Sequence, residues 1–454
     1  PPPADPAASR GEPVRMPGLT VIGSREDELA LPGSGTFVEP EQIREQAYDD
    51  VNQVLRQVPG VYVRQEDGFG LFPNLSLRGV DTTRSSKITV MEDGVLTAPA
   101  PYASPAAYYR PTVGRMRVVE VLKGSSQVRY GPHTTGGVIN YLSTPIPETM
   151  TTYLRTLYGQ QNEVRAHGHW GGTSETRLGT FGYLLEGYFR RSSGFKRIDG
   201  APNFTDRGDT GFTLAEPMLK LSWVPPTERE QRVELKLGYS NLDADEGYLG
   251  LSESDFRNDP FRRYAASRFD NIETEQFRSY LRYFVDAGLG VNLTTTLYGN
   301  PFERNWFKLN DLRGVERFGG PPGSTVNMDL SSALAGANGG YRLEALKGQR
   351  AGTLRVRNNE REYFLYGVDS VANRVFETGP VTHDVQLGVR FHTDRESRDQ
   401  RDELFRQDDQ GRIVEHTFGP SGGAGKRWEE ASAAAVFIED AIAWERFTFR
   451  PGLR

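Results

Sequence analysis

The stretch VLKGSSQVRYGPHTTGGVINYLSTP, residues 121–145, packs tight turns around two short β-prone runs. Gly124, Gly131 and Gly136 punctuate it, and glycine allows backbone conformations that other residues avoid. The final run, GGVINYLSTP, is a strand that stops at a proline, which cannot donate to a β-ladder. The stretch therefore predicts the end of a small, tightly turned domain.

Residues 37–147, which include this stretch, predict a compact α+β unit. Val51, Val54, Leu55 and Val58 follow helical spacing, and a Pro-Gly pair ends that helix. The runs LSLRGV, KITVMEDGV and MRVVEVLKG then alternate apolar and polar residues, with Asp-Gly and Gly turns between them.

Beyond residue 149 the pattern changes to long alternating segments. Apolar residues occupy every second position, which indicates strands with one apolar face. We expect roughly ten or eleven such strands. The clearest lie at residues 181–189, 233–239, 277–285, 289–297 and 385–391.

The connections between these strands alternate in length. A soluble β-sandwich rarely places every second connection on one side as a loop of about 20 to 50 residues, whereas an outer-membrane barrel does so routinely. We therefore favour a transmembrane antiparallel β-barrel over a soluble β-protein. The long connections are 191–211, 243–275, 303–357 and 395–428, and the short ones are 172–177, 224–231, 285–290 and 442–446.

Composition excludes several classes of function. The chain has no run of about 18 apolar residues for a helical span, and its net charge of -6 argues against nucleic acid. It has no cysteine, so disulfides and thiolate metal sites are absent. No catalytic motif is present, and we expect no enzyme. His167 and His169 share one strand face, where a polar lumen pair is favoured over a metal site.

Four motifs in this part of the chain, taken in order, resemble the plug of a TonB-dependent outer-membrane receptor. They are VNQVLRQVPGVYV, LSLRGV, ITVMEDGV and VEVLKGSSQVRYGPHTTGGVINYLSTP. The resemblance implies a plug at residues 25–148, lodged inside a 22-stranded barrel in the outer membrane of a Gram-negative bacterium. Residues 149–454 would be the N-terminal part of that barrel, with about half of its strands. We therefore expect a fragment of a longer receptor.

Residues 1–24 are expected to be a flexible arm, because the first 18 are rich in proline and small residues. The run GLTVIGS in this arm could be a first edge strand. The resemblance instead places the TonB box here, a segment that pairs with TonB as an added strand. It implies TonB as a partner, with its ExbB-ExbD energising complex, through Leu19, Thr20, Val21, Ile22 and Gly23.

Within the family, the plug is most similar to that of ferric citrate receptors. The stretch that carries this similarity is MEDGVLTAPAPYASPAAYYRPTVGRMRVVEVLKG. Phe69 and Ser104 stand where those receptors have a threonine and a glutamine that contact citrate, which argues for a larger chelate. The loop TAPAPYASPAAYY suits a stiff platform of aromatic and hydroxyl groups. Arginines of a long outer loop would attract an anion, although interleaved aspartates could compensate them. The predicted ligand contacts are Phe69, Tyr102, Ser104, Tyr108, Tyr109, Arg262 and Arg263.

Two basic residues match family positions that pair with acidic residues of the barrel wall. These are Arg78 and Lys123. Lysine offers a point charge instead of a bidentate fork, so a lock at Lys123 should be looser. A solvated or internally paired charge is the alternative.

The function implied by the resemblance is TonB-dependent uptake of a ferric chelate, either ferric citrate or a ferric siderophore. No cofactor is expected to stay bound, because iron would travel inside the chelate. Alternatives are a ligand-sensing receptor with little transport, or uptake of a non-iron ligand such as cobalamin or a sugar.

Proline at Thr20 or Val21 should abolish uptake and leave ligand binding intact, because an added strand needs the backbone N-H that proline lacks. Transport and binding assays on each variant measure this. Normal transport by the proline variants would remove the TonB-box assignment.

Overall fold

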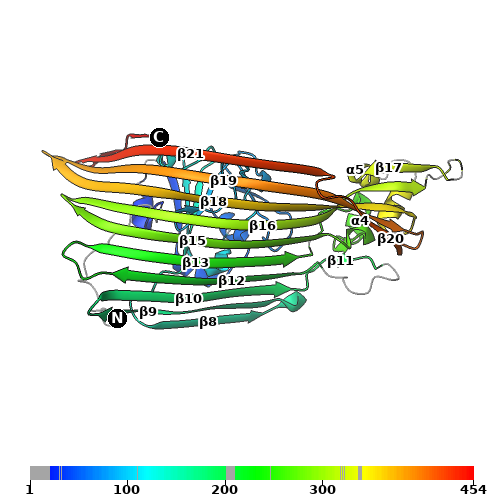
Figure 1. Cartoon of the computed structure of the whole chain (residues 1–454), viewed down its shortest axis with the longest axis horizontal. Helices are drawn as coiled ribbons and strands as arrows, with labels where there is room; N and C mark the ends of the chain where they lie inside the picture. Colours follow the sequence, from blue (N-terminus) through cyan, green and yellow to red (C-terminus); the bar gives the residue numbers. More distant parts are fainter. Residues whose placement is uncertain are drawn as a thin grey trace.

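The structure is a computed structural model that describes residues 21–29, 31, 33–109, 111–200, 210–245, 247–316, 319, 321, 323–335 and 340–454. An N-terminal mixed α+β unit, the plug, lies behind a long curved sheet, the wall (Figure 1). None of the described helices is long and apolar enough to span a membrane.

The plug is built on a five-stranded sheet in the order β1-β6-β7-β4-β5. Strands β4 and β7 run parallel, and the other neighbours are antiparallel. These strands are β1 Ser34–Val38, β4 Thr89–Glu92, β5 Val95–Leu96, β6 Met116–Lys123 and β7 Val138–Ser143. Beside the sheet lie a hairpin, β2 Val61–Arg64 with β3 Asn74–Leu77, and the helices α1 Arg25–Leu29, α2 Pro40–Gln46 and α3 Val51–Leu55.

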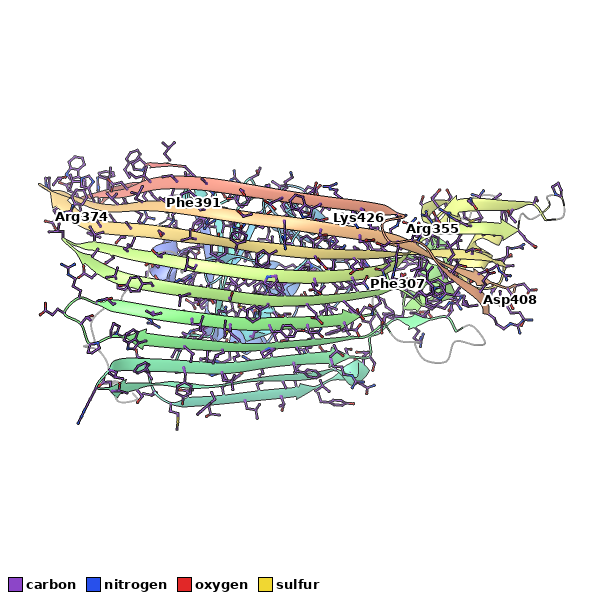
Figure 2. The ribbon with its side chains drawn as sticks, viewed as in Figure 1. Phe307, Arg355, Arg374, Phe391, Asp408 and Lys426 are labelled. Atoms are coloured by element: carbon purple, nitrogen blue, oxygen red, sulfur yellow. The ribbon has the colours of Figure 1, made fainter. Side chains whose placement is uncertain are left out.

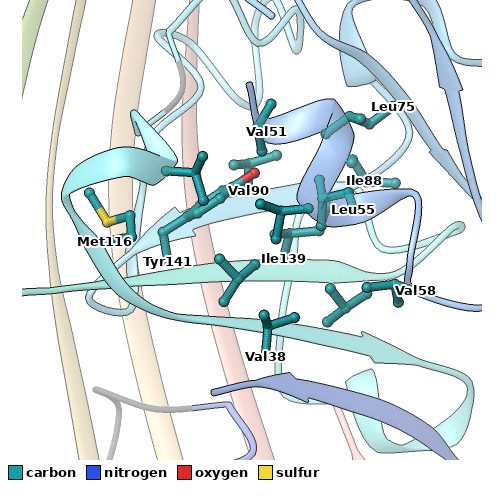
Figure 3. Close-up of a cluster of buried hydrophobic side chains, with 14 of the residues drawn as sticks. Val38, Val51, Leu55, Val58, Leu75, Ile88, Val90, Met116, Ile139 and Tyr141 are labelled. Atoms are coloured by element: carbon teal, nitrogen blue, oxygen red, sulfur yellow. The ribbon is translucent and has the colours of Figure 1, made fainter. Parts of the chain in front are cut away.

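Helix α3 confirms the helix expected from the valine and leucine spacing, although it ends at Leu55. Asp50 caps it by accepting a hydrogen bond from the backbone N-H of Asn52 at 2.8 Å. Its apolar face packs on the plug sheet, against residues such as Val90, Ile139 and Tyr141 (Figure 3). This buried cluster makes the plug a folded unit in its own right.

The wall is antiparallel throughout, with each strand paired to the next long strand of the chain. It runs from β8 to β22, and the expected strands at 181–189, 233–239, 277–285 and 385–391 all lie in it. The strand expected at 289–297 begins two residues later, because Leu289 and Gly290 form a turn with positive φ. The strands are β8 Thr151–Tyr158, β9 Val164–Thr176, β10 Gly179–Ser192, β12 Phe212–Val224, β13 Gln231–Ala244, β15 Asn271–Gly288, β16 Val291–Glu316, β18 Gly352–Thr378, β19 Val381–Gln407, β21 Gly425–Trp444, β22 Phe447–Phe449 and, paired with β21, β23 Gly452–Leu453.

Short turns join the wall strands at one end and long connections join them at the other, as expected (Figure 1). Strands β16, β18 and β19 have 26, 27 and 27 residues, far more than the about 10 that cross a bilayer. They continue into the regions expected as loops, 303–357 and 395–428. One face of these extensions packs against the long connections, where Leu312 and Leu354 are fully buried, and the backbone ladder persists. Figure 2 shows Arg374 and Asp408 near opposite ends of these strands.

The long connections and extended strands pack into an outer cap with its own apolar core. Leu312, Leu346 and Leu354 are fully buried in it. The cap contains β11 Arg197–Ile198, α4 Glu253–Asn258, β14 Arg262–Arg263, β17 Thr325–Asp329, α5 Leu330–Leu334, α6 Tyr341–Leu346 and β20 Ile413–Phe418. Single 3-10 turns occur at Thr83–Ser85, Val113–Arg115, Ser125–Gln127, Gln160–Asn162 and Ala265–Ser267.

The two faces of the wall differ in polarity. Leu297 and Leu387 point outward and are 50% and 45% exposed, whereas Arg282 and Arg304 point to the plug and are 2% and 1% exposed. The outward face is the apolar one, as a lipid-facing surface requires.

Leu387→Arg should lower the free energy of unfolding by about 2 to 4 kcal/mol, because it places a charge on the lipid face. Gln386→Glu is the matched control. It puts a charge on the opposite face, where the Nη1 of Arg129 lies 2.6 Å from the Gln386 side-chain oxygen and would compensate it. Unfolding titrations in lipid measure both, and equal losses would contradict the lipid-facing assignment.

Candidate functional site

A buried ion network joins the plug to the wall. Arg115 of the plug donates from Nε to Glu216 of β12 at 2.6 Å and from Nη1 to Glu92 of β4 at 3.0 Å. All three side chains are buried. The guanidinium therefore bridges a plug carboxylate and a wall carboxylate in an interior where charges interact strongly.

The wall supplies further cations to the turn between β4 and β5. Lys236 Nζ lies 2.7 Å from Glu92 Oε1 and 2.6 Å from Asp93 Oδ2. Lys220 lies 3.5 Å from Asp93, and Arg278 Nε lies 3.5 Å from Glu92. Burial alone would raise the pKa of Glu92, but Arg115, Lys236 and Arg278 hold that pKa well below its usual range. Both plug acids are therefore ionised counter-ions of the wall.

The sequence Asp93-Gly94 explains why these two acids stand at the tip of a hairpin. Both residues have positive φ, 51° and 79°, as the two-residue turn between antiparallel strands requires. The Gly94 N-H donates to Asn140 Oδ1 at 3.0 Å, and the Ser143 N-H donates to Asp93 Oδ1 at 2.9 Å. The hairpin is thus fixed to β7 and aims its carboxylates at the wall.

The two residues expected to lock plug and wall make no ion pair with the described part of the wall. Lys123 Nζ donates to the Pro59 carbonyl, also in the plug, at 2.5 Å. Arg78 is exposed, at a positive φ of 57°. In the described residues the lock is instead made by Arg115, Glu92 and Asp93, which sequence reasoning missed.

Above this lock, toward the cap, a cluster of cations surrounds Tyr108. The guanidinium carbons of Arg304, Arg84 and Arg361 lie 4.2, 5.6 and 5.8 Å from the centre of its ring. Burial alone would raise the pKa of Tyr108, but these three charges hold it below its ordinary value. Of the ligand contacts predicted from sequence, Tyr108 is the one that lies in this cluster.

Two more aromatic rings extend the cluster toward the cap. Lys308 Nζ lies 4.3 Å from the ring centre of Trp306 and 4.4 Å from that of Tyr248, and Arg84 lies 5.3 Å from Trp306. Such cation-π contacts hold cations in place without neutralising them. Arg84 is neutralised by Glu66 at 2.7 Å, so the net positive charge of the cluster lies chiefly on Arg304 and Lys308.

The strand register reveals a row of arginines that continues from the cluster. Arg304 pairs with Arg361, Arg361 with Arg398, and Arg398 with Arg427, on the adjacent strands β16, β18, β19 and β21. Like charges at directly paired positions destabilise a sheet. We call these four residues the arginine row.

The arginine row is only partly neutralised. Arg361 pairs with Glu396 at 3.1 Å, and Arg427 pairs with Glu429. The Nε and Nη1 atoms of Arg304 and the Nε of Arg398 are buried and have no acceptor among the described residues. Buried donors left unpaired are costly, and such sites commonly await a ligand. The row and the Tyr108 cluster together form a surface suited to anionic groups.

The other predicted ligand contacts lie elsewhere. Phe69 is buried against Phe195 and Phe212, and Tyr109 is buried with its hydroxyl 3.2 Å from Glu92 in the lock. In the cap, Arg262 pairs with Asp199, and Arg263 lies in β14. Tyr102 and Ser104 are half-buried in the plug loop at residues 97–109. A direct ligand role for these six residues stays a prediction.

The plug loop is itself fastened to the wall. Asp394 of β19 accepts the backbone N-H groups of Tyr102 and Ala103 at 2.8 and 2.9 Å. His392 bonds the same carboxylate at 2.9 Å and packs its ring 5.0 Å from that of Tyr102.

The predicted TonB box is only partly described, since Leu19 and Thr20 lie outside the described residues. The N-H groups of Val21, Ile22 and Gly23 all donate to the Glu120 carboxylate, at 2.8, 2.9 and 2.8 Å. Burial raises the pKa of Glu120, although these bonds oppose the shift. Asn140 donates to the same carboxylate at 2.8 Å.

The histidine pair on β9 has local partners. His167 Nε2 lies 2.9 Å from Glu186, and the His169 ring stacks on Tyr153 with 5.1 Å between centres. Across the described residues, histidine, aspartate and glutamate nowhere gather in threes as a metal site would need.

Comparison with known proteins agrees with this architecture. Residues 27–138 match the family model described as TonB-dependent Receptor Plug Domain. The chain is similar to the ferric citrate transporter FecA, with 20% identity and a TM-score of 0.69 over 95% of this chain and 57% of that one. It is also similar to BauA, the ferric preacinetobactin receptor from Acinetobacter baumannii, with 16% identity and a TM-score of 0.64 over 96% and 59%. The chain thus spans less than two thirds of the length of either of these two proteins.

The fold and the plug match define the class. Residues 27–138 match a TonB-dependent receptor plug domain, and the sheet that follows has the fold of part of the barrel of such receptors, which confirms the expected fold class. Receptors of this class sit in the outer membrane of Gram-negative bacteria, which places this chain there. The family consists of transporters and not of enzymes.

One cap residue beside the Tyr108 cluster is placed to respond to pH. The buried Asp270 carboxylate accepts the N-H of Leu309 at 2.7 Å and that of Tyr248 at 3.2 Å, and so holds the Tyr248 segment to β16. Burial raises the pKa of Asp270 to about 7, although both bonds and Lys308 oppose the shift.

The Tyr248 segment should be more stable at pH 5 than at pH 8. A raised pKa means that the folded state binds the proton more tightly, so the contribution of Asp270 to stability falls as pH rises from about 4 to about 7. Hydrogen exchange of the 247–271 region, corrected for its intrinsic pH dependence, measures this. Asp270→Asn should flatten the profile, and an unchanged profile in that variant would assign the effect to another group.

Proposed function

We propose that this protein takes up an anionic ferric chelate across the outer membrane, energised by TonB. The observation that carries the proposal is the arginine row beside the Tyr108 cluster, where buried guanidinium donors lack protein acceptors.

The chemistry of this surface favours oxygen-rich anions. Guanidinium groups bind carboxylates and similar planar anions with two parallel hydrogen bonds. A charge-assisted bond contributes about 1.5 to 3 kcal/mol. Neighbouring strands lie about 4.8 Å apart, so adjacent arginines of the row suit a ligand with several anionic oxygens.

The assignment of iron rests on the resemblance of the plug to ferric citrate receptors and on the solved structures. FecA is a ferric citrate transporter, BauA is a ferric preacinetobactin receptor, and the similar P. aeruginosa protein FpvA has been solved with iron and pyoverdine. A sensing receptor with little transport, and uptake of a non-iron ligand such as cobalamin or a sugar, are the alternatives. Iron would be cargo inside the chelate and not a resident cofactor.

The partner contact would form at the predicted TonB box. An added strand uses backbone N-H groups, and those of Val21, Ile22 and Gly23 are held by Glu120. Pairing with TonB, and through it with ExbB-ExbD, therefore requires this segment to leave Glu120 first.

Arg304→Gln and Arg361→Gln should each weaken chelate binding about tenfold, the effect of losing about 1.4 kcal/mol. Arg190→Gln is the matched control, because Arg190 is also buried on the plug-facing side but bonds Glu163 at 2.8 Å and the Phe69 carbonyl at 3.1 Å. Binding calorimetry with ferric citrate and with ferric siderophores measures all three.

If the wild-type protein bound only an iron-free ligand, the assignment of iron would be wrong, but the proposal of TonB-dependent transport would not be affected. Equal affinity in wild type and in both row variants would remove the arginine row from the ligand site. Binding without TonB-dependent uptake in cells would favour the sensing receptor.

A further inference from the structure

Below the Tyr108 cluster, a second set of buried donors lacks acceptors. They lie on the plug-facing side of β15, where the hairpin of β4 and β5 meets the wall, a contact we call the seam. All three guanidinium nitrogens of Arg278, the Nη1 of Arg282 and the side-chain amide of Gln276 have no hydrogen-bond acceptor among the described residues. These side chains are 2 to 5% exposed.

The seam is closed in this structure. Two small cavities flank Val95 of the hairpin, one of about 20 Å³ and one of about 40 Å³. Both are small, since a single water already needs about 10 to 15 Å³ of such volume, and neither could hold a chelate. Val95 packs between them against Tyr280, Tyr298 and Leu365 of the wall. A chelate could pass here only if the hairpin moved.

Movement of the hairpin would change the charge of the seam. Glu92 and Asp93 are the carboxylates that neutralise Lys236, Lys220 and Arg278. When the hairpin leaves, both acids leave with it, and the cations stay on the rigid wall. Removing one partner from a buried ion pair is strongly unfavourable unless another anion replaces it.

We propose that Lys220, Lys236, Arg278 and Arg282 form a second anion-binding site, which the plug's own Glu92 and Asp93 occupy at rest. The anionic oxygens of a passing chelate would take the place of these two carboxylates. The site is selective for anions, because a neutral ligand leaves the wall cations compensated only in part, by Glu234 of β13 beside Lys220 and Arg282. This inference rests on the proposed function for the identity of its ligand.

The spacing along the wall connects this second site with the outer site, by which we mean the arginine row and the Tyr108 cluster. Arg304 pairs with Thr274 of β15. Arg278 and Arg282 follow Thr274 by four and eight residues on the same face, so successive guanidinium groups are separated by about 13 Å along the strand. A chelate leaving the arginine row therefore meets the next cation within about its own length.

The first experiment separates binding from passage. In Arg278→Gln and Arg282→Gln, affinity at the outer site should stay within twofold of wild type, while TonB-dependent uptake should fall at least tenfold. Arg278→Lys and Arg282→Lys should restore most of the uptake, because the site needs charge. Arg190→Gln, which lies outside the seam, should take up chelate as wild type does.

If Arg278→Gln and Arg282→Gln took up the chelate as fast as wild type does, the inference would be overturned. The inference would also be overturned if the lysine variants lost as much uptake as the glutamine variants. The arginines would then act through their hydrogen-bond geometry in the plug lock and not through their charge. A loss of outer-site affinity in the seam variants would show one continuous site in place of two.

A second experiment needs neither iron nor transport. In the double variant Glu92→Gln and Asp93→Asn the wall cations lose their counter-ions and no longer hold the hairpin to the wall, so the seam can open without TonB. Calorimetry with iron-free citrate should then show a binding event that wild type lacks. Adding Arg282→Gln should weaken this event at least tenfold. Absence of the event in the folded double variant would overturn the second site. Failure of wild type to bind any ferric chelate would reject only the proposed function.

Discussion

The arrangement of the molecule depends on charge pairs buried between one plug hairpin and the wall. Apolar clusters hold the plug together internally, but at the seam the contact is made chiefly by Arg115, Glu92, Asp93 and the cations that face them. Ion pairs of this kind often add little net stability, because desolvation offsets much of the attraction. They do fix one geometry, since any displacement leaves a bare charge in a low dielectric. A plug held in this way is well positioned and still separable from its barrel.

Local chemistry made much of the fold predictable from sequence. Asp93-Gly94 indicated a two-residue turn, and both residues adopt the positive φ that such a turn requires. Alternation in residues such as 233–239 indicated strands with a lipid-facing side, because lipid enforces that pattern. The outer cap was expected as loops. Beyond the membrane no solvent boundary imposes alternation, so the extension of β16, β18 and β19 left no comparable pattern.

The candidate site was less predictable, because its residues meet only through strand register. Arg304, Arg398 and Arg427 fall in segments that the sequence indicated as long connections, and only Arg361 lies outside them. Their pairing across four strands depends on strand extension, exact loop lengths and bulges. Tyr108 was found because its loop is unusually rich in aromatic residues. Arg115 gave no comparable signal, since an arginine in GRMRV looks like any turn residue until Glu216 of a distant strand lies beside it.

Asn140 gives the plug sheet a mechanical property. Its amide donates to Glu120, the carboxylate that holds Val21, Ile22 and Gly23, and its oxygen accepts the N-H of Gly94 at the tip of the hairpin. These two bonds connect the N-terminal segment to the seam, in parallel with the backbone ladders that join β6, β7 and β4. Tension on that segment can therefore reach the hairpin tip, where the charge pairs with the wall must separate.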